Sequence, residues 1–148
     1  MSQIRKGFAR RLRTGRYSQA GQVYLVTTVT RERQAVFADF AAARLLVSVL
    51  RAESALGSCT TLAFVVMPDH LHWLLQLEQG LLSALVGRVK SISAKRLGRP
   101  IWQAGFHDRA LRREEDLQAT ARYLVANPLR AGLVTRVGLY PHWDAIWL

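Results

Sequence analysis

The chain has 148 residues, half of them hydrophobic, so it is long enough to bury one core and too apolar for a disordered protein. Lysine and arginine number 21 against 10 aspartate and glutamate residues, which gives a formal net charge of +11. A clustered excess of this size favours a polyanionic partner, nucleic acid in the first place. A generally basic surface that maintains solubility is the competing interpretation.

The single cysteine, Cys59, excludes an internal disulfide and a cysteine-based metal site. Pro68, Asp69 and two histidines interrupt the longest apolar region, so no transmembrane helix is expected. The basic N-terminus lacks the apolar core of a signal peptide. We therefore expect a cytoplasmic protein with no membrane partner, folded as one domain over residues 1–148.

The N-terminal arm, residues 1–20, is the most basic part of the chain. Its first 16 residues contain no acidic residue, and Phe8, Leu12 and Tyr17 are interleaved with its cations. The cations are Arg5, Lys6, Arg10, Arg11, Arg13 and Arg16. Basic residues with spaced aromatics suit an arm that follows a DNA backbone and stacks on a base. A solvated leader explains the composition equally well.

Hydrophobic periodicity and turn residues predict the order strand, helix, strand, strand, helix, strand. The expected ranges are 22–30, 39–56, 60–66, 70–77, 80–97 and 102–112. This order is typical of an α+β, ferredoxin-like split βαβ sandwich. In that fold the helices cover one face of an antiparallel sheet, and the first and third strands are central.

The outward side of the second helix is a second candidate DNA contact. It carries Arg88, Lys90 and Lys95 with Ser91 between them. Small hydroxyls between cations let a phosphate backbone approach closely. An ordinary solvated helix face remains the alternative interpretation.

Two histidines, His70 and His72, lie on the third strand. Because side chains alternate along a strand, both imidazoles point to one face, while Leu71, Trp73 and Leu75 point to the other. From spacing alone, a structural pair is the more common interpretation. The central position of the strand, with one face covered by helices, instead favours a site for a metal ion or a phosphate.

A third helix over 113–127 follows the predicted sheet and begins with three acidic residues. Tyr123 and Asn127 are four residues apart, so they lie one turn from each other, and Pro128 is expected to end the helix at Asn127. A tyrosine in this position is more often a packing residue. The tail over 128–148 contains further aromatics, among them Tyr140, Trp143 and Trp147, which we expect to close the core.

The candidate site has a coherent chemistry. A phenol with a pKa near ~10 is a poor nucleophile at neutral pH, unless a metal activates the electrophile. Two imidazoles and one amide oxygen would hold a divalent ion with neutral ligands only. Such an ion would keep its full charge for a scissile phosphate, and its binding would be weak.

Four segments of the chain together resemble the single-tyrosine HUH transposases, and within them the REP-associated tyrosine transposases. The segments are RYSQAGQVYLVTT, FVVMPDHLHWLL, WQAGFHDRALR and ARYLVANPLRAGLV. The resemblance covers almost the whole chain. It implies a ferredoxin-like nuclease, with an added C-terminal helix carrying the tyrosine, that cuts single-stranded DNA beside imperfect hairpins. It also implies a nucleoid-associated protein that acts as a monomer or a homodimer.

The resemblance assigns a role to each residue of the candidate site. His70 and His72 would be ligands of Mg²⁺ or Mn²⁺. Tyr123 would attack the scissile phosphate and form a 5′-phosphotyrosine with a free 3′-hydroxyl. Asn127 would be the third metal ligand, where related insertion-sequence enzymes have a glutamine and the REP-associated branch is similar to this chain.

Other residues in these segments keep two interpretations. Asp69 could orient His70 as a hydrogen-bond acceptor, or it could serve only the turn after Pro68. The fourth-strand segment suits either DNA contact or packing at the sheet edge. Its residues in question are Trp102, Phe106, His107 and Asp108.

Two other functions remain open. One is a domesticated hairpin-DNA binding protein that keeps the fold but cleaves poorly, against which the intact His70, His72, Tyr123 and Asn127 set argues. The other is an HUH nicking enzyme for replication or plasmid transfer. The short chain and the lone tyrosine on the third helix make that alternative less attractive.

Overall fold

The computed structural model describes residues 19–147, and its elements follow the predicted order. The strands are β1 Val23–Val29, β2 Cys59–Met67, β3 His70–Leu77, β4 His107–Leu111 and β5 Trp143–Ala145. The helices are α1 Phe40–Ala55, α2 Leu82–Leu97, α3 Glu114–Val125 and the single-turn α4 Asn127–Arg130. Short 3₁₀ turns at Arg31–Arg33, Val36–Ala38 and Val137–Leu139 complete the described fold.

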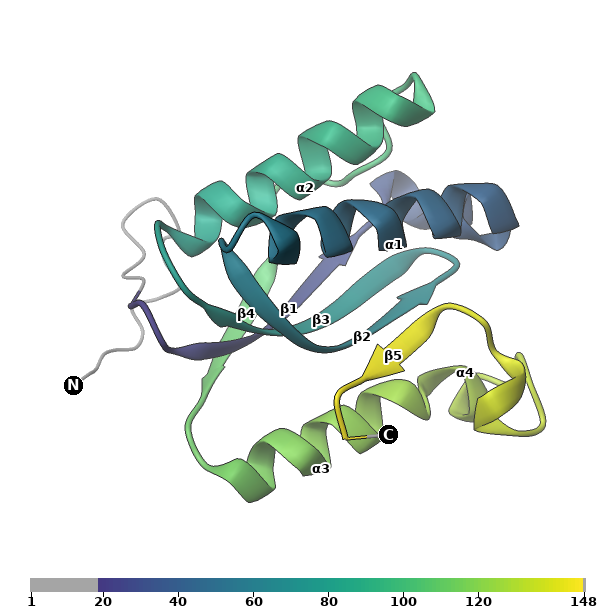
Figure 1. Cartoon of the computed structure of the whole chain (residues 1–148). Helices are drawn as coiled ribbons and strands as arrows, with labels where there is room; N and C mark the ends of the chain where they lie inside the picture. The colour runs from purple at the N-terminus through teal and green to yellow at the C-terminus, as the bar shows by residue number, and fades with distance from the viewer. Residues whose placement is uncertain (1–18, 148) are drawn as a thin grey trace.

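The strands form one antiparallel sheet in the order β4-β1-β3-β2-β5. Helices α1 and α2 cover one face, whereas α3 lies across the other face (Figure 1). This arrangement confirms the predicted α+β ferredoxin-like sandwich with an added tyrosine-bearing helix. Strand β3 lies in the middle of the sheet, as expected, so its side chains are flanked on both sides.

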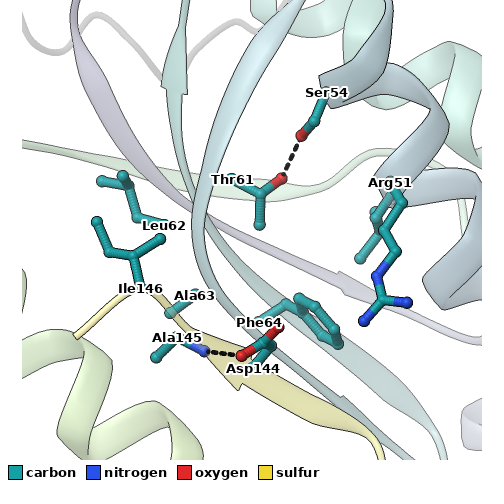
Figure 2. Close-up of a pocket in the computed structure, with 10 residues that line it drawn as sticks. Arg51, Ser54, Thr61, Leu62, Ala63, Phe64, Asp144, Ala145 and Ile146 are labelled. Atoms are coloured by element: carbon teal, nitrogen blue, oxygen red, sulfur yellow. Dashed lines mark hydrogen bonds between the residues drawn. The ribbon is translucent and has the colours of Figure 1, made fainter. Parts of the chain in front are cut away.

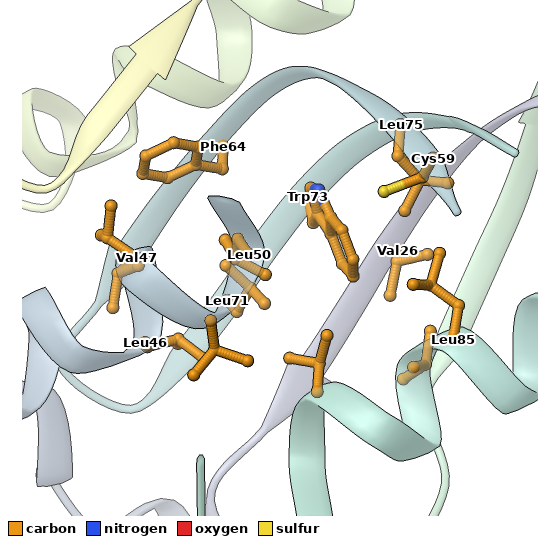
Figure 3. Close-up of a cluster of buried hydrophobic side chains, with 14 of the residues drawn as sticks. Val26, Leu46, Val47, Leu50, Cys59, Phe64, Leu71, Trp73, Leu75 and Leu85 are labelled. Carbon is orange, nitrogen blue, oxygen red and sulfur yellow. The ribbon is translucent and has the colours of Figure 1, made fainter. Parts of the chain in front are cut away.

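The main core lies between the sheet and the helices α1 and α2 (Figure 3). Trp73 and Leu75 of β3 are fully buried in it. The indole Nε1 of Trp73 donates a hydrogen bond to Thr61 Oγ1 at 3.0 Å, so its polar atom is satisfied. Cys59 is buried in this core as a free thiol, and burial raises its pKa. It is therefore a packing residue, as the sequence predicts.

A second, smaller core lies under α3. Leu117, Ala121 and Leu124 give this helix a buried stripe at helical spacing, and the stripe packs against Val65 and Leu74 of the sheet. Leu74 is fully buried. Because β3 alternates, this core faces the same side of the sheet as the two histidines. The packing of α3 therefore places the tyrosine helix next to the histidine face.

The predicted range of the fourth strand and the predicted end of the third helix are wrong. Strand β4 is shorter than 102–112, because residues 103–106 turn through Gly105, which has a φ of 79°, and Trp102 makes only an isolated bridge to Thr30. The third helix ends at Val125, and Asn127 begins α4 instead of ending α3. Proline lacks an N–H but is tolerated in a first helical turn, so Pro128 supports α4.

The tail over 128–148 also contains more structure than we expected. Strand β5 pairs with β2 and supplies the fifth strand of the sheet. Tyr140 donates a hydrogen bond to the backbone oxygen of Val66 at 2.6 Å, and Trp143 packs on the second core. The predicted packing role of these aromatics is thus confirmed.

Within the described residues, no helix is long and apolar enough to cross a membrane.

The packing of the second core predicts that two leucine-to-alanine substitutions differ strongly in their effect on the free energy of unfolding. Leu74→Ala removes a fully buried side chain beneath α3 and should lower the free energy of unfolding by about 2–5 kcal/mol. The matched variant Leu81→Ala, at a side chain that is 55% exposed, should change it by less than about 0.5 kcal/mol. Urea denaturation measures both, and equal effects would contradict this account of the packing of α3.

Candidate active site

The register of the sheet places His70 and His72 on the face that α3 partly covers. His72 lies between Val65 of β2 and Thr27 of β1, and Thr27 is in turn paired with His107 of β4. These four residues form a row across the sheet on one face. His107 is exposed at the end of the row. The histidine pair thus occupies a polar end of a face whose other end is apolar.

Each imidazole of the pair uses its Nδ1 atom for a contact within the protein. His70 Nδ1 lies 2.7 Å from Asp69 Oδ1, and His72 Nδ1 lies 2.9 Å from Thr27 Oγ1. The two rings are 4.8 Å apart at their centroids and nearly perpendicular. Neither Nε2 atom has a hydrogen-bond partner among residues 19–147. Rings held through Nδ1 with Nε2 available are typical of histidines that bind a metal.

Asp69 is the residue that orients His70, and it has a second partner. Arg33 Nε contacts Asp69 Oδ2 at 3.1 Å. Burial alone would raise the pKa of Asp69, but the hydrogen bond and charge of His70, together with Arg33, lower it below its usual value. An ionised carboxylate can only accept a hydrogen bond, so the Nδ1–H group of His70 donates to Asp69. This geometry therefore supports the orienting role considered for Asp69.

The turn that presents Arg33 is strained. Glu32 and Arg33 have φ values of 54° and 55°, a left-handed conformation that is uncommon for residues other than glycine. Strain of this kind is often found beside functional sites. Since Arg33 is 60% exposed at its side chain, its ion pair with Asp69 adds little stability. Its effect is on the charge and orientation of Asp69.

The imidazole of His72 is neutral at physiological pH. Burial, followed by the nearby charges of His70 and Arg130, lowers the pKa of His72 to about 4. A neutral imidazole offers its lone pair to a ligand without first losing a proton.

Tyr123 lies on the exposed side of α3, and its side chain is 68% exposed. The guanidinium carbon of Arg130 lies 3.6 Å from the centroid of its ring. The same guanidinium donates a hydrogen bond from Nη2 to Asn127 Oδ1 at 2.9 Å. Arg130 thereby joins the tyrosine to the asparagine, while its charge reaches His72.

The available donors restrict the kind of metal site. Among residues 19–147 there is no group of three or more His, Cys, Asp or Glu side chains that could hold a metal ion. A cation here would depend on the two Nε2 atoms and an amide oxygen such as that of Asn127. Imidazole nitrogen is a borderline ligand, so a hard divalent ion here would depend on oxygen ligands from the amide, from phosphate and from water. The residues present therefore fit such an ion.

Comparison with known proteins identifies the family. A sequence model of the transposases described as IS200-like matches residues 18–123. The chain belongs to the IS200-like transposase family. No curated protein sequence matches it.

Two solved structures have a fold similar to that of this chain. A REP-associated tyrosine transposase bound to a REP hairpin is 25% identical, with a TM-score of 0.72 over 97% of this chain and 82% of that one. A protein of Deinococcus radiodurans R1, assigned as a transposase, is 22% identical, with a TM-score of 0.55 over 81% of this chain and 95% of its own. The chain is thus similar in structure to a REP-associated transposase.

The cations predicted to contact DNA have different surroundings. Arg88 forms an ion pair with the buried Glu53 at 3.1 Å, and Lys90 Nζ donates to the backbone oxygens of Gln103 and Gly105 at 2.7 and 2.6 Å. Lys95 is exposed. Arg88 and Lys90 therefore have structural roles in the transposase. The cations of the N-terminal arm lie outside the described residues.

Sequence reasoning missed Arg130, Arg33 and Thr27. Arg130 follows Asn127 by three residues, a helical spacing that could have indicated the contact. Thr27 could have been found only from the strand register. No sequence signal points to Arg33, because its contact depends on the unusual backbone of its turn.

A separate hollow of about 250 Å³ lies at the edge of the sheet, between α1 and β5 (Figure 2). Arg51 and Phe64 line it, together with Ile146. None of the predicted site residues lies in it. The candidate active site is therefore separate from this hollow.

The low pKa of His72 predicts an acid-sensitive contribution to stability. An unfolded histidine titrates near ~6.5, so between that pH and about 4 the unfolded chain binds more protons than the folded one. This contribution is therefore present above pH ~6.5 and lost as the pH falls towards 4. Imidazole NMR with a metal chelator present should show His72 titrating near 4. Titration near 6.5 would contradict its burial.

The ion pair of Arg88 predicts a stability effect that Lys95 lacks. Arg88→Ala leaves the carboxylate of Glu53 buried without its partner and should cost about 1–3 kcal/mol. Lys95→Ala removes the same charge from the same helix and should change stability by less than about 0.5 kcal/mol. Thermal or urea unfolding measures both. Equal stability of the two variants would overturn the structural role of Arg88.

Proposed function

We propose that the chain is a metal-dependent single-stranded DNA endonuclease and strand transferase that acts on REP-type hairpins through a 5′-phosphotyrosine intermediate. The observation that carries the proposal is the group formed by Tyr123, Arg130 and Asn127, whose arginine charge also acts on His72. It combines an exposed phenol with imidazoles whose Nε2 atoms are available. We infer that the nucleophile and the metal ligands act together on one scissile phosphate.

In the proposed reaction, Tyr123 is the nucleophile. Its Oη atom forms a bond to the scissile phosphorus while the bond from that phosphorus to the 3′-oxygen breaks. The phenol proton leaves to solvent, and the departing 3′-oxygen takes up a proton to become a hydroxyl. The phosphodiester energy is kept in the tyrosine–DNA bond, so a second 3′-hydroxyl can reverse the step and join a new strand.

His70, His72 and Asn127 would hold the cation, Mg²⁺ or Mn²⁺. When bound, the cation would polarise the scissile phosphate and stabilise the charge on the departing oxygen. Asp69 and Thr27 fix the two imidazoles through Nδ1, so that both Nε2 atoms are available for it. The low pKa of His72 keeps its ring neutral for the same purpose.

The net charge of the chain and its similarity to a solved transposase support the proposed substrate. A net charge of +11 suits a partner made of phosphates, and the similar REP-associated transposase was solved with a REP hairpin. We assign hairpin contact to Lys95 and to the arm cations of residues 1–16. Acting on hairpins in the chromosome, the protein would work at the nucleoid, as a monomer or a homodimer.

The decisive experiment follows the covalent adduct. A single-stranded hairpin labelled at its 3′ end, incubated with Mg²⁺ or Mn²⁺, should become attached to wild-type protein in denaturing gels. Tyr123→Phe should give no adduct. Tyr140→Phe is the matched control, because Tyr140 is hydrogen-bonded to Val66 and burial raises its pKa to about 12, so its loss should leave the adduct intact.

Hairpin binding separates the proposal from its alternative. His72→Ala should abolish the adduct yet retain hairpin binding in gel-shift assays, because the substitution removes a metal ligand and leaves the DNA-contacting cations in place. An adduct that survives in Tyr123→Phe would disprove the nucleophile. Tight hairpin binding by wild-type protein without any adduct, under either cation, would instead support a binding protein that has lost cleavage.

A further inference from the structure

The proposed reaction assigns no role to Arg130, although its side chain contacts two residues of the candidate site. It lies on the exposed α4 turn, stacks over the ring of Tyr123 at 3.6 Å and donates to Asn127 Oδ1 at 2.9 Å. Its charge also contributes to the low pKa of His72. One guanidinium therefore touches the candidate nucleophile and the candidate third ligand, and lies near one of the histidines.

We propose that Arg130 is a positioning residue that holds Tyr123 for attack and competes with the divalent cation for Asn127. The inference rests on the proposed function, since it concerns the same nucleophile and ligands. In this arrangement, the guanidinium is bound to Asn127 when no cation is present. Binding of the cation releases Asn127 from Arg130, while the stack on Tyr123 remains.

The competition follows from charge. An amide oxygen has two lone pairs, so its geometry alone would allow a hydrogen bond and a metal bond together. A guanidinium and a divalent cation on one oxygen, however, lie a few ångströms apart and repel each other strongly in a partly desolvated site. Asn127 is partly buried, which limits screening by water. The cation must therefore displace Arg130 from this oxygen.

The positioning role follows from the exposure of Tyr123. Its side chain is 68% exposed, and its hydroxyl has no hydrogen-bond partner among residues 19–147. The ring contact with Arg130 is thus what restricts the rotamers of Tyr123 on the exposed side of α3. A planar guanidinium can stack on a ring and donate at its edge at the same time, which a lysine ammonium cannot do. The identity of the residue therefore matters as well as its charge.

These two roles predict that one substitution, Arg130→Ala, raises the affinity for Mn²⁺ and lowers the rate of adduct formation. Arg130→Ala frees Asn127 and removes a positive charge beside His72, so the protein without DNA should bind Mn²⁺ several-fold more tightly. The same variant leaves Tyr123 unrestrained, so single-turnover adduct formation at saturating Mn²⁺ should slow by about 10- to 100-fold. General damage to the site would instead weaken both properties. Mn²⁺ binding is measured by electron paramagnetic resonance of the free ion.

Two further variants complete the test. Arg130→Lys restores the charge, so its Mn²⁺ affinity should return close to wild type while its adduct rate recovers only in part. Arg122→Ala removes one exposed charge next to Tyr123 on α3, where Arg122 contacts Gln118, and should change neither property. Circular dichroism confirms that each variant is folded.

The outcomes are distinguishable from those that test the reaction itself. Absence of an adduct in wild-type protein would overturn the proposed function and this inference with it. A normal wild-type adduct with an unchanged rate in Arg130→Ala would overturn the positioning role alone. Unchanged or weaker Mn²⁺ binding in Arg130→Ala would overturn the competition for Asn127.

Discussion

The two-residue alternation of the central strand β3 is the constraint on which the rest of this structure depends. It sends Leu71, Trp73 and Leu75 into the main core and turns His70 and His72 to the opposite face. A shift of one residue in register would bury both imidazoles under α1 and α2. Burial of a tryptophan and two leucines therefore holds the histidine pair on the outer face, so stability and site geometry depend on one register.

The helix α3 completes the arrangement by covering only part of that face. Its apolar stripe packs on the sheet around Leu74, while His70 and His72 on the same face are half-buried. At its C-terminus the chain turns through Pro128 into α4, which carries Arg130 back towards His72. A polar group thus forms at the edge of a packed core, and the protein does not need an enclosed pocket to build it.

The contacts around this group are short and mostly local. Asp69 adjoins His70 in sequence, and Asn127 and Arg130 are three residues apart, so each pair comes together almost automatically. Contacts between residues far apart in sequence add specificity, since Thr27 contacts His72 from the neighbouring strand β1 and Arg33 contacts Asp69 from a strained turn.

The sequence by itself determined the strand and helix order and the shared face of His70 and His72, because these follow from local periodicity. It did not predict the short strand β5 or the separate α4 turn, since both depend on contacts that bring the tail back to the sheet. Only the tertiary structure decided that Arg88 holds a buried carboxylate and that Arg130 stacks on Tyr123. A cation on a helix looks the same in sequence whether its partner is solvent, DNA or the protein itself.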